Sequence, residues 1–275
     1  MLKLFFKLLV ELTGNPLSSR CLRFIAESRG SAFLNRLFVK TFAVKMEEAE
    51  SSLHEYKSLQ SLFVRKLKPG IRPIDPRPNA LVSPVDGILS AYGRITQDST
   101  FLVKGDLYRL RDVLGKEDAE HRYQNGHYFV LYLSPGHYHR IHSPANGAIL
   151  EQWHLGRTSY PVNRLGMKYG GHPFSKNYRL ISEMATPYGN IAVIKIGALN
   201  VNSIHLTHAT SVLTKGEEIG YFSFGSTVIL FTETADFRYV QTLVEGKSLR
   251  YGEPLGCFTA FVPLSCGGGC TKSRG

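Results

Sequence analysis

The stretch Gly220-Tyr-Phe-Ser-Phe-Gly-Ser-Thr-Val-Ile-Leu-Phe231 joins a glycine-containing turn to an apolar run. Its second half, 226–231, is rich in β-branched and aromatic residues, which is typical of a buried strand. Similar runs occur at 129–133 and 191–196, each between turn signals, while helical periodicity is scarce beyond residue 120. The later part of the chain is therefore predicted to be a mostly antiparallel β body.

The start of the chain has a different pattern. Apolar residues recur at helical spacing in two sets, with basic residues interleaved between them. The sets are Leu2, Phe5, Phe6 and Leu9, and then Phe33, Leu34, Leu37, Phe38 and Phe42. Residues 1–45 hold eight basic and two acidic residues. Basic amphipathic helices suit an anionic membrane surface, although the same pattern fits helices that pack on the rest of the protein.

A proline-rich segment separates these two parts. Residues 66–78 contain four prolines and a glycine, which exclude helix. We expect an α+β fold of N-terminal amphipathic helices followed by the β body. The predicted regions are 1–78 (helical, basic and membrane-associating, with the hinge), 79–258 (the catalytic domain) and 259–275 (a flexible tail).

Composition narrows the class of protein. The 275 residues are 43% hydrophobic and 20% charged, with 33 Lys and Arg against 22 Asp and Glu, a net charge of +11. Such a chain folds and favours an anionic partner. Nucleic acid fits poorly because no stacking motif or DNA-binding module is present. No apolar run approaches the ~20 residues that span a bilayer. The four cysteines do not form a disulfide framework, so a reducing compartment is predicted; they are Cys21, Cys257, Cys266 and Cys270.

Three short segments carry residues suited to chemistry. Asp86 lies on a Pro/Gly turn within Ser83-Pro-Val-Asp-Gly87, where an ordinary turn aspartate is the simpler interpretation. Ser226 lies between a glycine and a strand. A nucleophile elbow of the Gly-x-Ser-x-Gly type is excluded because residue 228 is Val.

The third segment, 132–144, contains His137, His139 and His142. Imidazole moves protons near neutral pH, which suits acid–base catalysis. The spacing also fits zinc ligands, joined by His205 or His208. A zinc-dependent hydrolase is therefore an alternative, and hydrogen-bonded loop histidines are a third interpretation.

In this order and spacing, the segments resemble the phosphatidylserine decarboxylase family. The match rests on Ser83-Pro-Val-Asp-Gly87, Tyr138-His-Arg-Ile-His142 and Phe224-Gly-Ser-Thr227, and it is supported by 63–73 and 193–204. It covers roughly residues 50 to 257. Phe224 departs from the Leu or Gly of many relatives, and the tail from Cys266 to Cys270 lies outside the match.

The resemblance implies a chain that cleaves itself between Gly225 and Ser226. The family's triad falls on Asp86, His142 and Ser226, in roles like those of a serine protease. Ser226 would attack the Gly225 carbonyl, His142 would take its proton, and Asp86 would fix the histidine tautomer. Elimination and hydrolysis would leave a β chain, 1–225, and an α chain, 226–275, that begins with a covalent pyruvoyl group derived from Ser226.

The same resemblance implies the reaction. The pyruvoyl ketone would form a Schiff base with the amine of phosphatidylserine and accept electrons as CO2 leaves, giving phosphatidylethanolamine. His139 is expected to stabilise the substrate carboxylate or supply the final proton. No metal is expected. The chain lacks a targeting extension, as in short bacterial forms, so a peripheral place on the cytoplasmic side of the cell membrane is predicted. A homodimer of two-chain pairs is compatible with the resemblance, and a non-enzymatic membrane-binding protein is a further alternative.

Overall fold

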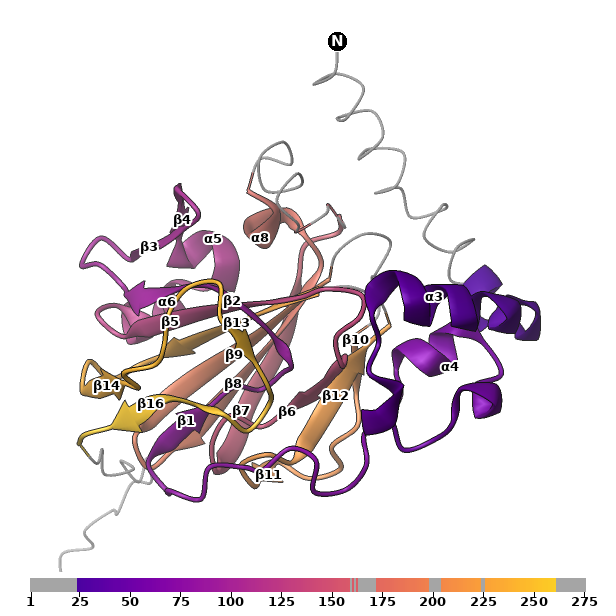
Figure 1. The fold of residues 1–275 in the computed structure, drawn as a ribbon. Helices are drawn as coiled ribbons and strands as arrows, with labels where there is room; N and C mark the ends of the chain where they lie inside the picture. The colour runs from indigo at the N-terminus through magenta and orange to yellow at the C-terminus, as the bar shows by residue number, and fades with distance from the viewer. Residues whose placement is uncertain are drawn as a thin grey trace, which may run out of the picture.

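The structure is a computed structural model that describes residues 24–158, 160, 162, 172–197, 204–223 and 226–260. The first predicted helix, the tail with Cys266 and Cys270, and both Phe224 and Gly225 lie outside the described residues. The observed mixture of N-terminal helices and mostly antiparallel sheets confirms the α+β prediction (Figure 1). The three region boundaries stay predictions.

Short helices come first along the described chain. They are η1 (Arg29–Leu34), α3 (Asn35–Phe42), η2 (Met46–Glu48), η3 (Leu53–Glu55) and α4 (Leu59–Phe63). Phe38 of α3 packs against Phe63, with ring centroids 6.1 Å apart, whereas Phe33 and Leu37 remain 79% and 62% exposed. One side of this predicted amphipathic segment therefore packs on the protein while its apolar neighbours face outward. No helix among the described residues is long and apolar enough to cross a bilayer.

The β body is built around one large antiparallel sheet. Its order is β11 (Val212–Leu213), β7 (Gly147–Leu155), β8 (Arg179–Thr186), β9 (Gly189–Gly197), β13 (Ser226–Thr232), β5 (His127–Leu133), β2 (Gly87–Arg94) and β15 (Ser248–Leu249). The three runs predicted as strands are thus confirmed as β9, β13 and β5, which lie side by side in the centre (Figure 1). Their continuous apolar sequence follows from burial of both faces of the sheet.

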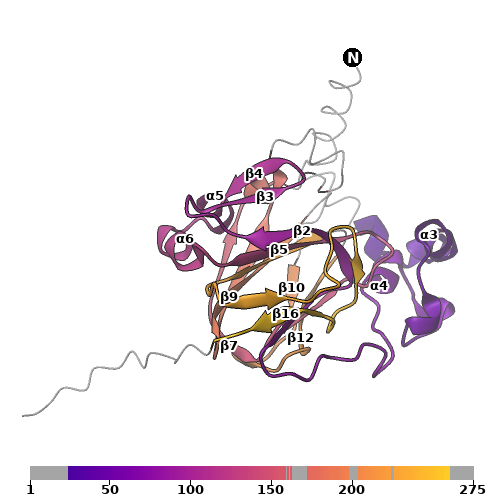
Figure 2. The same cartoon turned by 60° about the vertical axis from the view of Figure 1, so that its left-hand side comes forward.

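Each face of this sheet carries its own core. Along β13, Ile229 and Phe231 point to one face while Val228 and Leu230 point to the other. The first face is covered by the hairpin β3 (Thr100–Val103)–β4 (Asp106–Arg109) and by α5 (Leu110–Leu114), α6 (Glu117–Tyr123) and α8 (Pro173–Lys176) (Figures 1 and 2).

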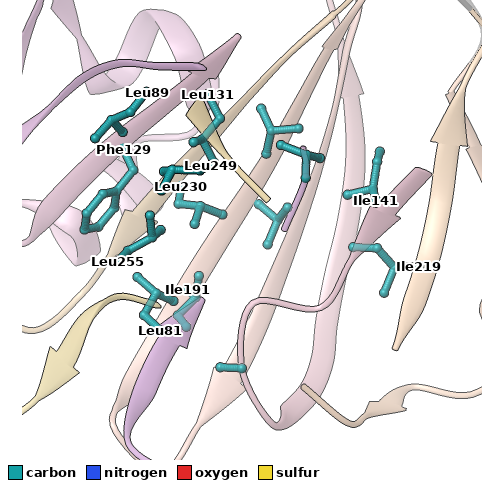
Figure 3. Close-up of a cluster of buried hydrophobic side chains, with 14 of the residues drawn as sticks. Leu81, Leu89, Phe129, Leu131, Ile141, Ile191, Ile219, Leu230, Leu249 and Leu255 are labelled. Carbon is teal, nitrogen blue, oxygen red and sulfur yellow. The ribbon is translucent and has the colours of Figure 1, made fainter. Parts of the chain in front are cut away.

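Two small sheets cover the second face. One contains β10 (Ile204–Leu206), β12 (Glu218–Phe222) and β6 (Arg140–His142); the other contains β1 (Ala80–Val82), β16 (Pro254–Phe258) and β14 (Phe237–Tyr239). Ile141 and Ile219 from the first, and Leu81 and Leu255 from the second, meet Leu230 and its neighbours in this core (Figure 3). β12 ends at Phe222, four residues before β13 begins at Ser226.

A close backbone contact joins the helical segment to the β body. A Cβ atom added to Gly136 would lie 2.1 Å from the Phe42 carbonyl oxygen. Any residue with a side chain would clash with this oxygen, so the close contact requires glycine. The end of α3 therefore lies directly against the turn that precedes His137.

Candidate active site

Ser226 is the first residue of β13 and is fully buried. The strand pairs it with Leu133 on one side and Gly197 on the other. Its Oγ has no hydrogen-bond partner among the described residues. Leaving a buried hydroxyl unpaired costs about 1–3 kcal/mol, so such a group in a folded protein points to a functional role.

His142 lies on β6 with both ring nitrogens engaged. Nδ1 is 2.8 Å from the Gly216 carbonyl oxygen, and Nε2 is 3.1 Å from the Tyr138 hydroxyl. Since a carbonyl only accepts, Nδ1 carries the proton and Nε2 accepts from Tyr138. Burial lowers the pKa of His142, although the Gly216 carbonyl and nearby carboxylates oppose this. His142 is therefore a neutral imidazole with a basic Nε2, the form that a general base requires.

Asp86 lies on the turn before β2 and is 8% exposed. Arg72 holds its carboxylate through Nε, 3.2 Å from both oxygens, and through Nη2, 2.7 Å from Oδ2. The Tyr251 backbone N–H donates to Oδ1 at 2.9 Å. Arg72 also contacts Glu48. Burial alone would lower the pKa of Arg72, but its bonds to Asp86 and Glu48 raise it above the usual value. The predicted proline-rich hinge thus contributes a buried cation to the site.

Tyr251 connects Asp86 and His142. Its ring lies flat on the His142 imidazole, with centroids 3.7 Å apart, and its N–H binds Asp86. The sequence-based hypothesis gave Asp86 the task of fixing the His142 tautomer, whereas the Gly216 carbonyl occupies Nδ1 in this structure. The Asp86 charge still favours the protonated form of His142. No hydrogen bond joins Asp86 to the His142 ring among the described residues, and the Asp86 oxygens are held by Arg72 and Tyr251.

His139 is fully buried beside the same strands. Its ring lies on Phe63 with centroids 3.9 Å apart, and Nδ1 is 2.8 Å from the His137 carbonyl oxygen. Its own carbonyl accepts from Phe222 N–H at 3.0 Å, four residues before Ser226. Nε2 has no partner among the described residues, and burial followed by the Arg65 charge lowers the pKa well below the usual range. His139 therefore presents an unpaired, neutral Nε2.

The proposed zinc ligands do not gather at one point. Ser134 N–H donates to Nδ1 of His137 at 3.1 Å, while His139 and His142 lie on different aromatic rings. His205 stacks on Tyr221. Within the described parts of the chain, no three His, Cys, Asp or Glu side chains are grouped as a metal site. The zinc-hydrolase alternative therefore has no support in the structure.

A cavity of about 290 Å³ lies next to these groups, between the helical segment and the sheet. Asp86, His137 and Tyr138 line it on the sheet side, and Phe42 and Lys45 line it on the helical side. The lining also includes three further basic side chains, those of Arg65, Arg72 and Arg250. A cavity with convergent polar groups and perturbed titratable residues is the usual setting of an enzyme site. An α+β enzyme is the class that this arrangement defines.

Comparison with known proteins identifies the family. The phosphatidylserine decarboxylase family model matches residues 59–257. The chain is 49% identical over 256 residues to a phosphatidylserine decarboxylase proenzyme of Geobacillus sp. (strain WCH70), covering 93% of this chain and 99% of that protein. It is 48% identical to the proenzyme of Geobacillus kaustophilus and 46% identical to that of Anoxybacillus flavithermus, covering 93% of this chain and 97% of each relative. The chain belongs to the phosphatidylserine decarboxylase family, whose members are lyases.

Sequence reasoning missed four side chains of the site. Arg65 and Arg72 lie in the segment 63–73, and Tyr138 begins the segment 138–142, so the segments that resemble the family already contained them. Nothing in the sequence indicated that the two arginines are buried in the site, because an arginine near prolines suggests solvent exposure. Tyr251 lies more than a hundred residues from His142 and had no signal at all.

Proposed function

We propose that this chain decarboxylates phosphatidylserine to phosphatidylethanolamine and CO2 after cleaving itself between Gly225 and Ser226. The observation that carries the proposal is the buried, unpaired Ser226 hydroxyl at the start of β13. Two buried histidines with lowered pKa lie on the neighbouring segment, and the family membership supplies the reaction. The proenzyme names of the relatives support maturation by cleavage.

The maturation step needs only groups of the chain itself. Ser226 Oγ attacks the carbonyl carbon of Gly225, so a C–O bond forms, the C–N bond breaks, and the amide becomes an ester. The hydroxyl proton passes to Nε2 of His142 and then to the released amine, while Asp86 stabilises the transient imidazolium. For this transfer, Nε2 exchanges the Tyr138 hydroxyl for that of Ser226.

The second step releases the fragments. Loss of the Ser226 Cα proton breaks the Cβ–O bond, and the 1–225 chain leaves as a carboxylate. Water then replaces the nitrogen of residue 226, ammonia leaves, and the 226–275 chain begins with a pyruvoyl group. When formed, this group supplies a ketone that serves as an electron acceptor for an amine substrate. The buried start of β13 would surround such a group mostly with protein, which strengthens electrostatic interactions with it.

His139 is proposed to act on the substrate. Its unpaired Nε2 can accept the proton that the substrate ammonium gives up as the Schiff base forms, and it can then return that proton to the carbon that loses CO2. Its fixed position on Phe63 and the His137 carbonyl limits the movement of that nitrogen. A residue with this role is needed for turnover and not for self-cleavage.

The helical segment is proposed to bring the enzyme to its lipid. Phe33 and Leu37 are exposed, and Arg36 and Lys40 are exposed on the same segment. Apolar side chains among basic ones bind the surface of an anionic membrane. We therefore propose peripheral association with the cytoplasmic side of the cell membrane. We also propose, from the family resemblance, that two copies of the two-chain pair assemble as a homodimer.

Intact mass spectrometry of the purified protein tests the central proposal. The active protein should contain a 225-residue and a 50-residue chain, the latter with a pyruvoyl terminus instead of an amine. Ser226→Ala should stay uncut, and Asp86→Asn and His142→Ala should cleave at least tenfold more slowly. His139→Ala should mature but lose turnover. An active protein that remains a single 30.7 kDa chain would contradict the proposal.

A further inference from the structure

The cavity lies near the end of the central strands at which Ser226 begins β13. Ser226 pairs directly with Leu133, and the next residue, Ser134, lines the cavity. On the neighbouring strands, Asp86 directly precedes β2, and Leu249, which pairs with Gly87, also lines the cavity. Successive residues are 3.8 Å apart and paired strands about 5 Å apart, so this wall begins within about 10 Å of Ser226. Ser226 is not itself one of the lining residues, so a ligand in the cavity would have to extend over about this distance to reach it.

The cavity has a surplus of positive charge. Four basic side chains line it, against the carboxylates of Glu48 and Asp86. Arg72 is saturated by these two acids, and Arg250 pairs with Glu48 at 3.4 Å. Among the described residues, Lys45 and Arg65 therefore have no carboxylate within ion-pair distance, and Glu48 and Asp86 act on them only at longer range. A pocket with four cations and two carboxylates favours an anionic ligand.

Arg65 adds an independent observation. It is 4% exposed, and Nη2 donates to the carbonyl oxygens of Gly136 at 2.8 Å and His137 at 3.1 Å. Nη1 makes one long contact with Leu62 O at 3.5 Å, and Nε has no partner among the described residues. A guanidinium has five N–H donors, so two remain available. Burying a cation with spare donors is costly, and an anion is the ligand that offsets this cost.

The chemistry of decarboxylation decides which anion fits. The substrate carboxylate must lose its charge as CO2 leaves, so strong cationic binding of that group would stabilise the ground state and slow the reaction. A phosphodiester keeps its charge throughout, and cationic contacts to it position the substrate without opposing the chemical step. Phe42, 42% exposed, lines the same cavity, so the acyl side of such a ligand has an apolar exit.

We propose that this cavity binds the phosphodiester of the lipid headgroup through Arg65, Lys45 and Arg250, an inference that rests on the proposed function. Arg65 lies at the buried end, while the side chain of Arg250 is 46% exposed and that of Lys45 is exposed. The volume of about 290 Å³ is close to the lower end for small-molecule sites, which suits a headgroup whose acyl chains remain outside.

The test measures binding separately from chemistry. Uncut Ser226→Ala protein is titrated by calorimetry with glycerophosphoserine, with serine and with inorganic phosphate. Glycerophosphoserine should bind at least tenfold more tightly than serine or phosphate. Lys45→Gln and Arg250→Gln should each weaken it about tenfold, and Arg65→Lys should do so if it folds, while Lys66→Gln, an exposed lysine outside the cavity, should not.

Equal binding of serine and glycerophosphoserine, or unchanged affinity in both Lys45→Gln and Arg250→Gln, would overturn this assignment. Phosphate binding as tight as that of glycerophosphoserine would do so too, by showing a free-phosphate site. In the mature enzyme, Lys45→Gln should raise KM, and it should not slow self-cleavage. Failure of the proposed function appears differently, as absence of cleavage in the parent protein while headgroup binding persists.

Discussion

The His142 imidazole and the Tyr251 ring stack face to face, with centroids 3.7 Å apart and planes 3° apart. The backbone N–H of the same tyrosine holds Asp86, whose charge acts on His142. The Tyr138 ring stacks on Tyr251 with centroids 5.6 Å apart, and the Tyr138 hydroxyl is hydrogen-bonded to Nε2 of His142. The proposed base is thus fixed by two aromatic residues and one carbonyl, which makes its position depend on packing as much as on hydrogen bonds.

Tyr251 should matter through its ring. Tyr251→Phe keeps the ring and the backbone N–H, so self-cleavage should remain within about twofold of the parent rate. Tyr251→Leu removes a stacked pair worth about 0.5–1.5 kcal/mol and should slow cleavage roughly threefold to tenfold. The rate at which the 50-residue fragment forms, followed by mass spectrometry, separates the two variants. Equal slowing in both would show that the hydroxyl matters instead.

Self-cleavage should persist in mildly acidic solution. Burial lowers the pKa of His142 below its usual value of 6.5, so more than half of the base is unprotonated when the pH reaches that value. The cleavage rate at pH 6.5 should therefore remain above half of its value at about pH 8, and the half-maximal rate should lie at a more acidic pH. Rates measured on freshly refolded chain at a series of pH values provide the check. A half-maximal rate at pH 6.5 or above would contradict a lowered pKa.

Arg72 should support stability as well as the site. Its side chain is 3% exposed and is bonded to Asp86 and Glu48. Arg72→Met leaves the buried Asp86 carboxylate without its cation and leaves Glu48 with only the longer pair to Arg250. This change should reduce the free energy of unfolding by about 3–5 kcal/mol. Urea unfolding of the uncut Ser226→Ala chain measures the loss. Arg77→Met, which breaks the exposed pair with Asp75, is the control and should change stability far less.

Lys195 should make stability depend on pH. It is fully buried on β9, Nζ donates to Ser182 Oγ at 2.6 Å, and burial lowers its pKa to about 7 from 10.5. Between these two pKa values the unfolded chain binds a proton that the folded chain does not, so the free energy of unfolding rises with pH. Below about pH 7 the full cost of burying the lysine is present, and this cost is removed as the pH rises toward 10.5.

Lys195→Met should therefore be more stable than its parent at pH 7, when both carry Ser226→Ala. Its advantage should shrink by about 2–3 kcal/mol by pH 9, because only the parent gains stability over this interval. Urea unfolding at the two pH values measures the difference. Lys66→Met, at an exposed lysine, should show no such change with pH. An advantage of Lys195→Met that is independent of pH would show that Lys195 is protonated in the folded state.

The central strands could be predicted from sequence because both of their faces are buried. A short, continuous apolar run such as 226–231, bounded by turn signals, is typical of a strand covered on both sides, and β5, β9 and β13 were found this way. The flanking hairpin β3–β4 and the small sheets were not assigned. Their strands are three to five residues long, and their pairing depends on contacts distant in sequence, such as Ala80 with Cys257.

The candidate site was predictable only in part. Asp86, His139, His142 and Ser226 were selected because three segments together matched a family, and the structure places the first three as buried groups near the start of β13. The partner of each polar atom could not be inferred. That Gly216 rather than Asp86 bonds Nδ1 of His142 is set by the loop before β12, whose path no local pattern specifies.

The position of Ser226 as the first residue of a doubly paired strand has a mechanical consequence. Seven residues of β13 are bonded to β9 on one side and to β5 on the other. Of the strands that follow, β15 pairs with β2 at the edge of the same large sheet, and β14 and β16 pair with each other in the small sheet that contains β1. A scission just before β13 would cut the covalent chain while leaving the shorter fragment threaded through the middle of the longer one. The two pieces would then copurify as one body and come apart only when the whole assembly is denatured.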